Sequence, residues 1–160
     1  MPDGRLIDVT SGTKHAALEA LYRKHQTMLL RLAWLLTGNR LDAEDLVQAV
    51  FLRYSRIDQP PANPKAYLRT MVVNAARDLG REHGRESPSQ IVPDGISNSP
   101  EVSEIWDAIQ ELPDDQRVVL ILRYHDDLSH EEISQILDCP IGTVRSRISR
   151  GLARLREGMS

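Results

Sequence analysis

The stretch LSHEEISQILDCPIGTVRSR, residues 128–147, decides how the second half of the chain folds. Ser129 and Glu132 have the S-x-x-E spacing of a capping box, in which each side chain accepts a hydrogen bond from the other residue's backbone amide, so a helix is predicted to start at Ser129. The run Asp138-Cys139-Pro140 ends this helix after about two turns. A second helix follows, and its predicted buried stripe has helical spacing: Val144, Ile148, Leu152 and Leu155. Two short helices joined by a tight turn form the helix-turn-helix pattern.

The exposed face of this second helix is rich in arginine. It carries Thr143, Arg145, Ser146, Arg147, Arg150 and Arg154. Arginine makes paired hydrogen bonds to guanine, while serine and threonine hydroxyls reach phosphates or base edges. A basic helix near a chain end can also be a merely solvated helix, but here the capping box, the turn and the buried stripe occur together. We therefore expect this helix to bind DNA, with the first five of these residues as contacts.

The first half of the chain contains three predicted helices. Apolar residues recur at spacings of three and four over about residues 15–37, and Gly38 follows where a helix end favours a left-handed residue. A second helix is predicted to open at Asp42, which can cap its first turn. After a proline-rich break, Asn63 is predicted to cap a third helix that starts at Pro64.

Residues 84–100, GRESPSQIVPDGISNSP, lack helical periodicity and are rich in serine, proline and glycine, which is typical of a linker. The later run VVLIL, residues 118–122, could form a strand, but a proline before it and helical flanks favour a helix. The predicted fold class is all-α: two small helical domains joined by a flexible linker, the second a four-helix domain with the helix-turn-helix. The predicted division is a mobile leader (1–13), a first domain (14–84), the linker (85–100) and a second domain (101–158).

The composition limits the class of protein. Of the 160 residues, 41% are apolar and 27% are charged, as in a soluble globular protein, and the 4% of aromatic residues favours helix over sheet. No apolar run approaches the roughly 18 residues that span a membrane, and the amino terminus lacks the apolar core of a signal peptide. The single cysteine, Cys139, excludes an intramolecular disulfide framework and fits the reducing cytoplasm, where we expect the protein to act.

The charge is distributed unevenly along the chain, although its net value is only −3. Residues 101–138 contain eleven acidic residues and two arginines, whereas residues 141–160 contain five arginines and one glutamate. Residues 63–86 are weakly basic, with five basic and three acidic residues. Such segregation is expected of a DNA-binding protein with separate protein-binding faces, although solvated helix faces also produce it.

Three stretches resemble the extracytoplasmic-function sigma factors, a group of bacterial transcription-initiation factors in the sigma-70 family. Residues 129–147 are similar to the region 4 pattern of this family, which reads roughly S-x-E-E-I-A-x-x-L-x-x-P-x-G-T-V-x-S-R. Residues 42–52 (DAEDLVQAVFL) resemble the region 2 segment that docks on the clamp helices of the polymerase β′ subunit. Residues 64–68 (PKAYL) resemble the region 2 helix that handles the minus-ten element. The order and spacing also fit, so the resemblance covers nearly the whole chain.

The resemblance implies a factor that binds core RNA polymerase and directs promoter-specific transcription initiation. It implies polymerase contacts at Asp45, Leu46 and Gln48, and it makes the arginine-rich helix the reader of an upstream promoter element. For the minus-ten element, the expected contacts are Asn63, Lys65, Arg69, Asn74, Arg77 and Arg81. The implied partners are the β′ clamp helices, the β flap, promoter DNA and an anti-sigma factor.

The sequence departs from the family pattern at three positions. Ser134 replaces the usual alanine in the first helix of the turn motif, which keeps a small residue there. Tyr67 replaces a common tryptophan and keeps an aromatic ring with a polar tip. Gly151 falls inside the final helix, where glycine costs about 1 kcal/mol relative to alanine.

Two other classes of function fit parts of the sequence. A free-standing helix-turn-helix regulator would bind duplex DNA through residues 129–157 and use residues 14–84 to dimerise or to bind an effector. A metal-dependent enzyme would need acids from several elements to converge on a pocket, whereas the acids here cluster at helix starts, where capping explains them. The histidines have irregular spacing and Cys139 is the only cysteine, so we expect no metal, no other cofactor and no catalytic activity.

Overall fold

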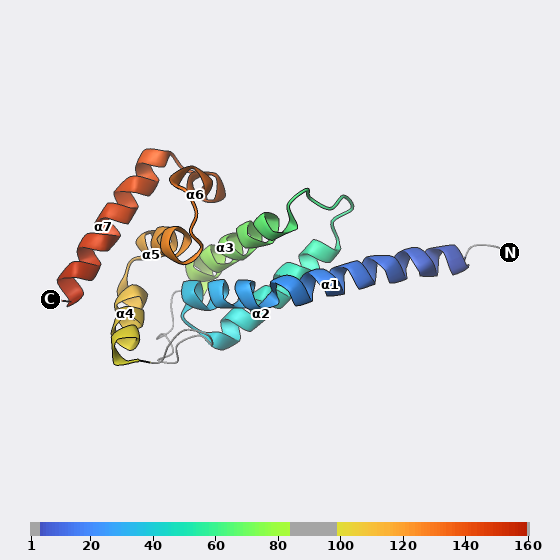
Figure 1. The fold of residues 1–160 in the computed structure, drawn as a ribbon, viewed down its shortest axis with the longest axis horizontal. Helices are drawn as coiled ribbons and strands as arrows, with labels where there is room; N and C mark the ends of the chain where they lie inside the picture. The colour runs from blue at the N-terminus through green and yellow to red at the C-terminus, as the bar shows by residue number, and fades with distance from the viewer. Residues whose placement is uncertain (1–3, 84–98, 160) are drawn as a thin grey trace.

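Seven α-helices and one π-helical turn make up the described parts of the chain, residues 4–83 and 99–159 of a computed structural model (Figure 1). In chain order they are α1 (Gly4–Thr37), α2 (Arg40–Ser55), α3 (Pro64–His83), α4 (Pro100–Glu111), α5 (Asp114–Leu120), the π-helical turn η1 (Ile121–His125), α6 (His130–Leu137) and α7 (Ile141–Met159). These two ranges contain no strand, which confirms the predicted all-α class. The predicted linker lies outside the described residues, except for its last two.

Helix α1 begins earlier than the sequence predicted and ends where it predicted. It starts at Gly4 rather than near His15, so the expected leader is helical wherever the structure describes it. Residues 12–17 are exposed, so these six residues supply no buried stripe from which a helix could be predicted. Figure 1 shows this end of α1 projecting beyond the other helices. At the far end, Gly38 is left-handed, with a φ of 74°, and its amide donates to the Trp34 carbonyl oxygen at 2.7 Å.

The N-cap of helix α2 is Asn39 rather than the predicted Asp42. The Asn39 Oδ1 accepts a hydrogen bond from the Asp42 amide at 3.2 Å, so Asp42 lies in the first turn of the helix. Asparagine and aspartate are about equally good N-caps. Helix α2 starts directly after the left-handed turn at Gly38, so Asn39, the earlier of the two residues, occupies the N-cap position.

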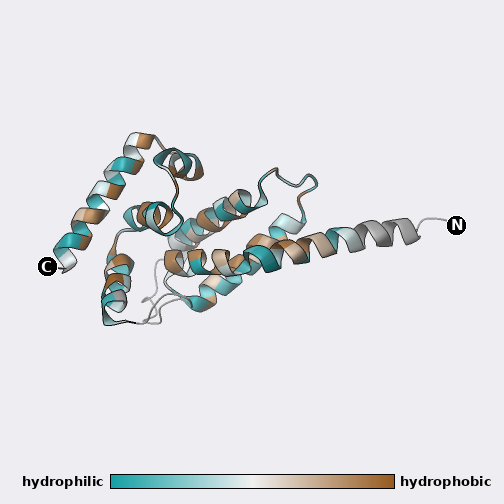
Figure 2. Ribbon diagram, in the orientation of Figure 1, coloured by the Kyte–Doolittle hydropathy of each residue, from teal (hydrophilic) through white to brown (hydrophobic). Residues whose placement is uncertain are grey.

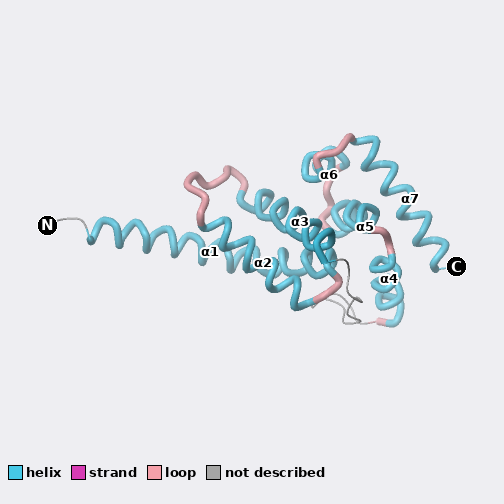
Figure 3. The backbone as a smooth tube through the Cα atoms, turned by 180° about the vertical axis from the view of Figure 1, so that it is seen from behind, coloured by secondary structure: helices cyan, strands magenta, loops and turns pink. Residues whose placement is uncertain are grey.

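Helix α3 begins as predicted and completes the first half of the molecule. The Asn63 Oδ1 accepts from the Ala66 amide at 3.1 Å, and Pro64 occupies the first helical position, where the missing amide proton is not needed. Helices α1, α2 and α3 pack side by side in Figures 1 and 3. Their shared core includes Leu29, Leu32, Val47, Val50, Leu68 and Val72. In Figure 2 the hydrophobic bands of α1 lie where it runs beside α2 and α3.

The second half folds around residues 118–122, the run predicted to be a buried helix. These residues belong to α5 and η1, and all five are buried. Arg117, just before them, is also buried, and its guanidinium donates to the Leu112 carbonyl oxygen at 3.0 Å and to the Asp114 carboxylate. Burial lowers the pKa of Arg117, while Asp114 acts in the opposite direction. The side chain therefore fixes the turn between α4 and α5.

The two halves pack against each other. Gln110 of α4 is buried, and its side-chain amide donates to the Leu35 carbonyl oxygen of α1 at 3.1 Å. Buried apolar residues of both halves form one continuous cluster, and α3 contacts both α5 and α6. Figure 3 shows this contact from behind, with the two chain ends at opposite ends of the molecule. None of the described helices has the length and apolar character needed to cross a membrane.

Candidate nucleic-acid interface

Helices α6 and α7 form the predicted helix-turn-helix. The capping box is complete: the Glu132 amide donates to the Ser129 Oγ at 3.0 Å, and the Ser129 amide donates to the Glu132 Oε1 at 3.2 Å. These hydrogen bonds lower the pKa of Glu132. At the other end, Asp138 is left-handed, with a φ of 51°, and the Ser134 hydroxyl donates to the Cys139 carbonyl oxygen at 2.6 Å. Both ends of α6 are therefore fixed by local hydrogen bonds, which set the angle at which α7 leaves.

The apolar face of α7 holds this helix against the rest of the second half. Val144 and Ile148 are buried, and Leu152 and Leu155 pack against the core from the same side. Gly151 is also buried on this face, and the helix continues past it to Met159. The apolar stripe predicted from the sequence is confirmed.

The five predicted DNA contacts on α7 differ in exposure. Arg145 and Arg150 are exposed, and the other three are half-buried: Thr143, Ser146 and Arg147. The Arg147 side chain is 26% exposed, and its guanidinium lies 3.8 Å from the Asp115 carboxylate of α5. Arg147 must therefore leave Asp115 to reach a phosphate, whereas Arg150 already lies at the surface.

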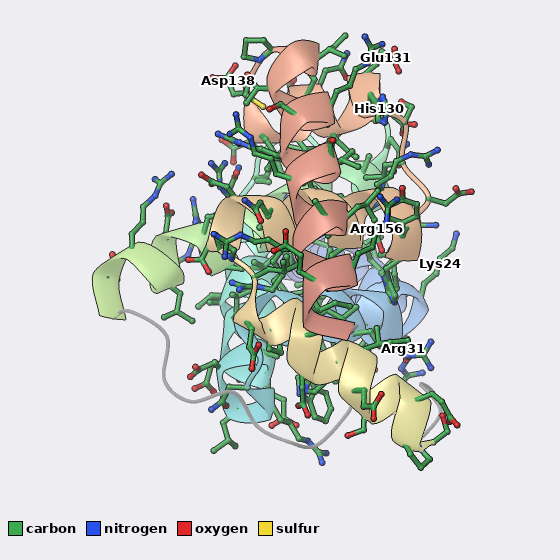
Figure 4. All side chains as sticks on the ribbon, turned by 90° about the vertical axis from the view of Figure 1, so that its left-hand side faces the viewer. Lys24, Arg31, His130, Glu131, Asp138 and Arg156 are labelled. Atoms are coloured by element: carbon green, nitrogen blue, oxygen red, sulfur yellow. The ribbon has the colours of Figure 1, made fainter. Side chains whose placement is uncertain are left out.

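Four of the five side chains meet in one cleft of about 520 Å³ between α7 and the start of α5: Thr143, Ser146, Arg147 and Arg150. The opposite wall comes from Pro113, Asp115 and Gln116. Arg145 lies outside this cleft, and its Nε is 3.5 Å from the His130 Nδ1. In Figure 4, His130 is seen on α6 beside the first turns of α7. The structure thus brings four of the predicted contacts together, whereas the fifth, Arg145, contacts His130 of α6.

Three features of this surface could not be read from the sequence. His130 and Asp115 resemble ordinary polar residues at helix starts, and only the tertiary fold places them beside arginines of α7. Arg154 was predicted to share the basic face, but it lines a separate cleft with acidic residues of α4: Glu104, Asp107 and Glu111. Arg154 is therefore surrounded by negative charge, which disfavours a phosphate contact there.

The predicted minus-ten residues do not form a single surface. Helical spacing places Lys65 and Arg69 on one face of α3 and the remaining three on another: Asn74, Arg77 and Arg81. Of these three, Arg77 is half-buried and the others are exposed. Asn63 precedes the helix, and since its Oδ1 serves as the cap, only its amide group is left for another contact. Arg69 is largely buried against Asp126 of the second half.

A pocket of about 590 Å³ joins Asn63 and Lys65 to helix α1. Its lining from α1 includes Lys24, His25 and Met28. His25 is only 8% exposed, and this burial, together with the charges of Lys24 and Lys65, lowers the pKa of His25. The neutral ring, with one donor and one acceptor, is therefore favoured. His25 and Lys65 lie on different predicted helices, so their proximity could not be read from the sequence.

An exposed stripe on α2 carries two of the three predicted polymerase contacts. Asp45 and Gln48 are exposed. Leu46 is only 7% exposed and belongs to the core, so it packs α2 against the rest of the molecule. Leu41 and Leu52, which are 70% and 57% exposed, fall on the same helical face as Asp45 and Gln48. The sequence did not single out these leucines, because exposure cannot be read from a leucine-rich helix. This α2 stripe (Leu41, Asp45, Gln48 and Leu52) is the mixed polar and apolar surface that a protein partner would need.

Two family models match the chain. The model described as sigma-70 region 2 matches residues 21–86, and the model described as sigma-70 region 4 matches residues 103–155. Together they include α2, α3 and the helix-turn-helix. The described residues hold no group of three or more histidine, cysteine or acidic side chains that could bind a metal ion.

Individual relatives agree with the two models. The ECF RNA polymerase sigma factor SigW of Bacillus subtilis (strain 168) is 33% identical and covers 83% of this chain and 83% of its own length. The ECF RNA polymerase sigma factor SigE of Mycolicibacterium smegmatis is 32% identical and covers 98% of this chain and 67% of its own length. Among solved structures, the sigma factor RpoE of Bartonella quintana, crystallised with the anti-sigma factor NepR, is 28% identical. It has a TM-score of 0.69 over 88% of this chain and 97% of that chain.

Proposed function

This chain belongs to the extracytoplasmic-function group of the sigma-70 family, and from that premise we propose which of its surfaces meet polymerase and which meet DNA. As a member of this family it binds core RNA polymerase and directs promoter-specific transcription initiation. A free-standing regulator is not favoured, because the region 2 match covers the residues that such a regulator would use for dimerisation. In the proposed division of labour, residues 14–84 bind polymerase and the minus-ten element. Residues 101–158 bind the upstream, minus-thirty-five element.

Helix α7 is proposed to read the upstream element. The observation that carries this assignment is the complete helix-turn-helix with exposed Arg145 and Arg150 on its second helix. Arginine can bond to a guanine edge or to phosphate, and both need an exposed guanidinium. Thr143, Ser146 and Arg147 are assigned the supporting contacts, since they line the adjoining cleft.

The minus-ten element is proposed to meet α3 and the loop before it. Asn63 and Lys65 share a pocket with His25, and unpaired bases need a pocket with hydrogen-bonding groups to leave the stack. Asn74, Arg77 and Arg81, on another face of α3, are assigned to the strand's phosphates and sugars. Arg69 is assigned a phosphate contact as well, which its present burial prevents.

The α2 stripe is proposed to bind the β′ clamp helices of the polymerase. Leu41 and Leu52 would supply the apolar contact area, and Asp45 and Gln48 the hydrogen bonds. We assign the β flap to the second half of the chain. We also propose that the protein works in the cytoplasm, has no catalytic activity of its own, and is regulated by an anti-sigma factor, as the Bartonella relative is bound to one.

Reconstitution with purified core polymerase tests the whole proposal. The full chain is mixed with core enzyme, and run-off transcripts are collected from a pool of upstream sequences. The chain should bind the core and select a common promoter sequence. Failure to bind any core polymerase would overturn the proposed function.

Two pairs of variants then test the division of labour. Arg145→Ala and Arg150→Ala should reduce promoter-specific transcription and leave core binding intact, and Arg156→Ala on the same helix is the control. Asp45→Ala combined with Gln48→Ala should weaken core binding itself. Glu44→Ala is the matched control for this pair. Glu44 lies on the same helix, but its carboxylate is already paired with Arg40 at 2.9 Å. Loss of core binding in the Arg145 and Arg150 variants, or full core binding in the Asp45 and Gln48 double variant, would contradict the assignment.

A further inference from the structure

The pocket between α1 and the start of α3 has the size and lining of a small-molecule site. Four residues of α1 line it at helical spacings of three and four, so they share one face of that helix: Leu21, Lys24, His25 and Met28. The opposite wall consists of residues 63–65. The pocket volume of about 590 Å³ lies within the range of about 300–1,000 Å³ that is typical of small-molecule sites.

The pocket collects positive charge. Lys24 and Lys65 each supply one ammonium group, from opposite walls, and they are two of the three lysines in the chain. The pKa of His25 is lowered first by burial and then by the charges of both lysines, so both ammonium groups act on the same ring. Among the described residues, those that line the pocket include no acid, and none forms an ion pair with either lysine. Such a pocket attracts an anion, and lysine binds phosphate as a point charge.

His25 is a buried polar side chain that points to a ligand. It is only 8% exposed, it lines the pocket, and it forms no hydrogen bond within residues 4–83 and 99–159. Buried polar groups in folded proteins are nearly always satisfied by protein, water or a ligand, because an unpaired donor or acceptor is destabilising. The neutral ring offers one donor and one acceptor. It is therefore suited to a ligand that carries both kinds of group, as the edge of a nucleobase does.

The rest of the lining suits a flat ring. Leu21 and Met28 lie about one turn before and one turn after His25, so they flank the imidazole with apolar surface. A methionine thioether packs favourably against an aromatic ring. The Asn63 amide nitrogen adds a donor, since only its oxygen is used in the cap of α3. The pocket thus combines ammonium groups for a phosphate with apolar and hydrogen-bonding groups for a base.

From these observations we propose that the pocket binds a single nucleotide, with its phosphate on Lys24 and Lys65 and the edge of its base on His25. Use of the site by promoter DNA rests on the proposed function, in which an unpaired base enters the same pocket. Binding of a free nucleotide does not rest on it. A free nucleotide and the promoter strand would then compete for one site.

Titration calorimetry of the full chain with thymidine 5′-monophosphate is the first test. Inorganic phosphate and thymidine should each bind at least about tenfold more weakly than the nucleotide, because each carries only part of the recognised groups. Lys24→Gln and Lys65→Gln should each weaken nucleotide binding about tenfold. Lys14→Gln is the matched control, because Lys14 is exposed on the same helix outside the pocket. Equal losses in the Lys14 and Lys24 variants, or no nucleotide binding, would overturn the proposal.

Proton NMR of the histidine rings then locates the ligand. The ring signal of His25, assigned by its loss in His25→Gln, should move as the nucleotide is added. The signal of His15, which is exposed on the same helix, should stay in place. A His25 signal that does not move while the nucleotide binds would place the ligand elsewhere and overturn the proposal.

A thymidine trinucleotide distinguishes the two sources of the phosphate. Tighter binding than the monophosphate, with the same loss in Lys24→Gln, would support the site and identify a DNA strand as its ligand. Equal affinity would support the site and identify a free nucleotide. A chain that binds the nucleotide but no core polymerase would refute the proposed function and leave this site standing. A chain that is active in run-off transcription but binds neither probe would overturn this proposal alone.

Discussion

A Cβ added to Gly151 would lie 2.8 Å from the Cδ1 of Leu120, closer than side chains approach in folded proteins. Leu120 is buried in α5 and its Cγ would be 3.2 Å away, so the leucine has little room to move. We predict that Gly151→Ala lowers the free energy of unfolding by about 1 kcal/mol. Overpacking costs about 1–3 kcal/mol, which exceeds the gain of about 1 kcal/mol in helix propensity. Urea unfolding followed by circular dichroism measures the change.

Gly158 provides the comparison for this substitution. It lies near the end of the same helix, and an added Cβ there would meet nothing within 4 Å. Gly158→Ala should therefore leave the free energy of unfolding unchanged or raise it slightly. A stabilised Gly151→Ala variant would show that α5 and α7 can separate at no cost.

The capping box predicts the effect of removing a hydroxyl. Ser129→Ala should lower the free energy of unfolding by about 1 kcal/mol, because the Glu132 amide loses its acceptor. The contribution of Glu132 depends on pH: its pKa is lowered in the folded chain, so its stabilising effect is full above its unfolded pKa and is lost as the pH falls through the folded value. Thermal unfolding at neutral and acid pH measures both. Ser149→Ala, at an exposed position of α7, should have no such effect.

His25 predicts a different response to acid. Its pKa is lowered below 6.5 by burial, so unfolding takes up a proton between the folded pKa and 6.5. Stability should be full above about pH 6.5 and should decline as the pH falls through this window. We expect His25→Leu to make the stability curve flatter there, and His15→Leu, at an exposed position, to leave it unchanged. Equal slopes in the two variants would show that His25 is not buried as a neutral ring.

The arginines of α7 predict a salt dependence. Each phosphate contact that is removed should reduce the slope of log K against log salt by about 0.9 for duplex DNA. Arg145→Ala and Arg150→Ala in the polymerase holoenzyme should each weaken promoter binding. Loss of a phosphate contact lowers the salt slope, whereas loss of a base contact leaves the slope unchanged. Fluorescence anisotropy at several salt concentrations measures it. An unchanged affinity in both variants would remove α7 from the interface.

The exposed leucines of α2 predict a loss of polymerase binding without a loss of fold. Leu41→Ser and Leu52→Ser together should weaken core binding about tenfold, which corresponds to about 1.4 kcal/mol. Because both side chains are exposed, the free energy of unfolding should stay the same. Surface-immobilised core polymerase measures the affinity, with Arg53→Ser on a neighbouring face of α2 as the control. Full binding by the double variant would restrict the contact to Asp45 and Gln48.

Features set by neighbouring residues could be predicted from the sequence. The caps at Asn63 and Ser129 and the left-handed Gly38 depend on hydrogen bonds that span only a few residues, so their spacing alone was sufficient. The error at Asp42 has the same origin. Asn39 and Asp42 are similar caps, and only the position of the preceding turn decides between them.

Features that depend on contacts between distant segments could not be predicted. From the sequence, Gly151 was expected only to destabilise α7. The structure shows that a glycine is needed there, because α5 approaches α7 too closely for a Cβ. Arg69 was expected to contact DNA, since no local pattern in the sequence reveals that Asp126 lies beside it. Leu46 and Leu52 have the same chemistry, but the fold buries the first and exposes the second.

The turn η1 has a consequence for how this chain can evolve. The Asp126 amide donates to the Ile121 carbonyl oxygen at 3.2 Å, which gives the turn one residue more than an α-helix would have. Deleting a single residue from this turn would restore a regular α-helix and rotate the downstream residues by about 100°. Asp126 would then point away from Arg69, while the helix content stayed nearly the same. A one-codon deletion would therefore break the ion pair between Arg69 and Asp126 without removing a helix.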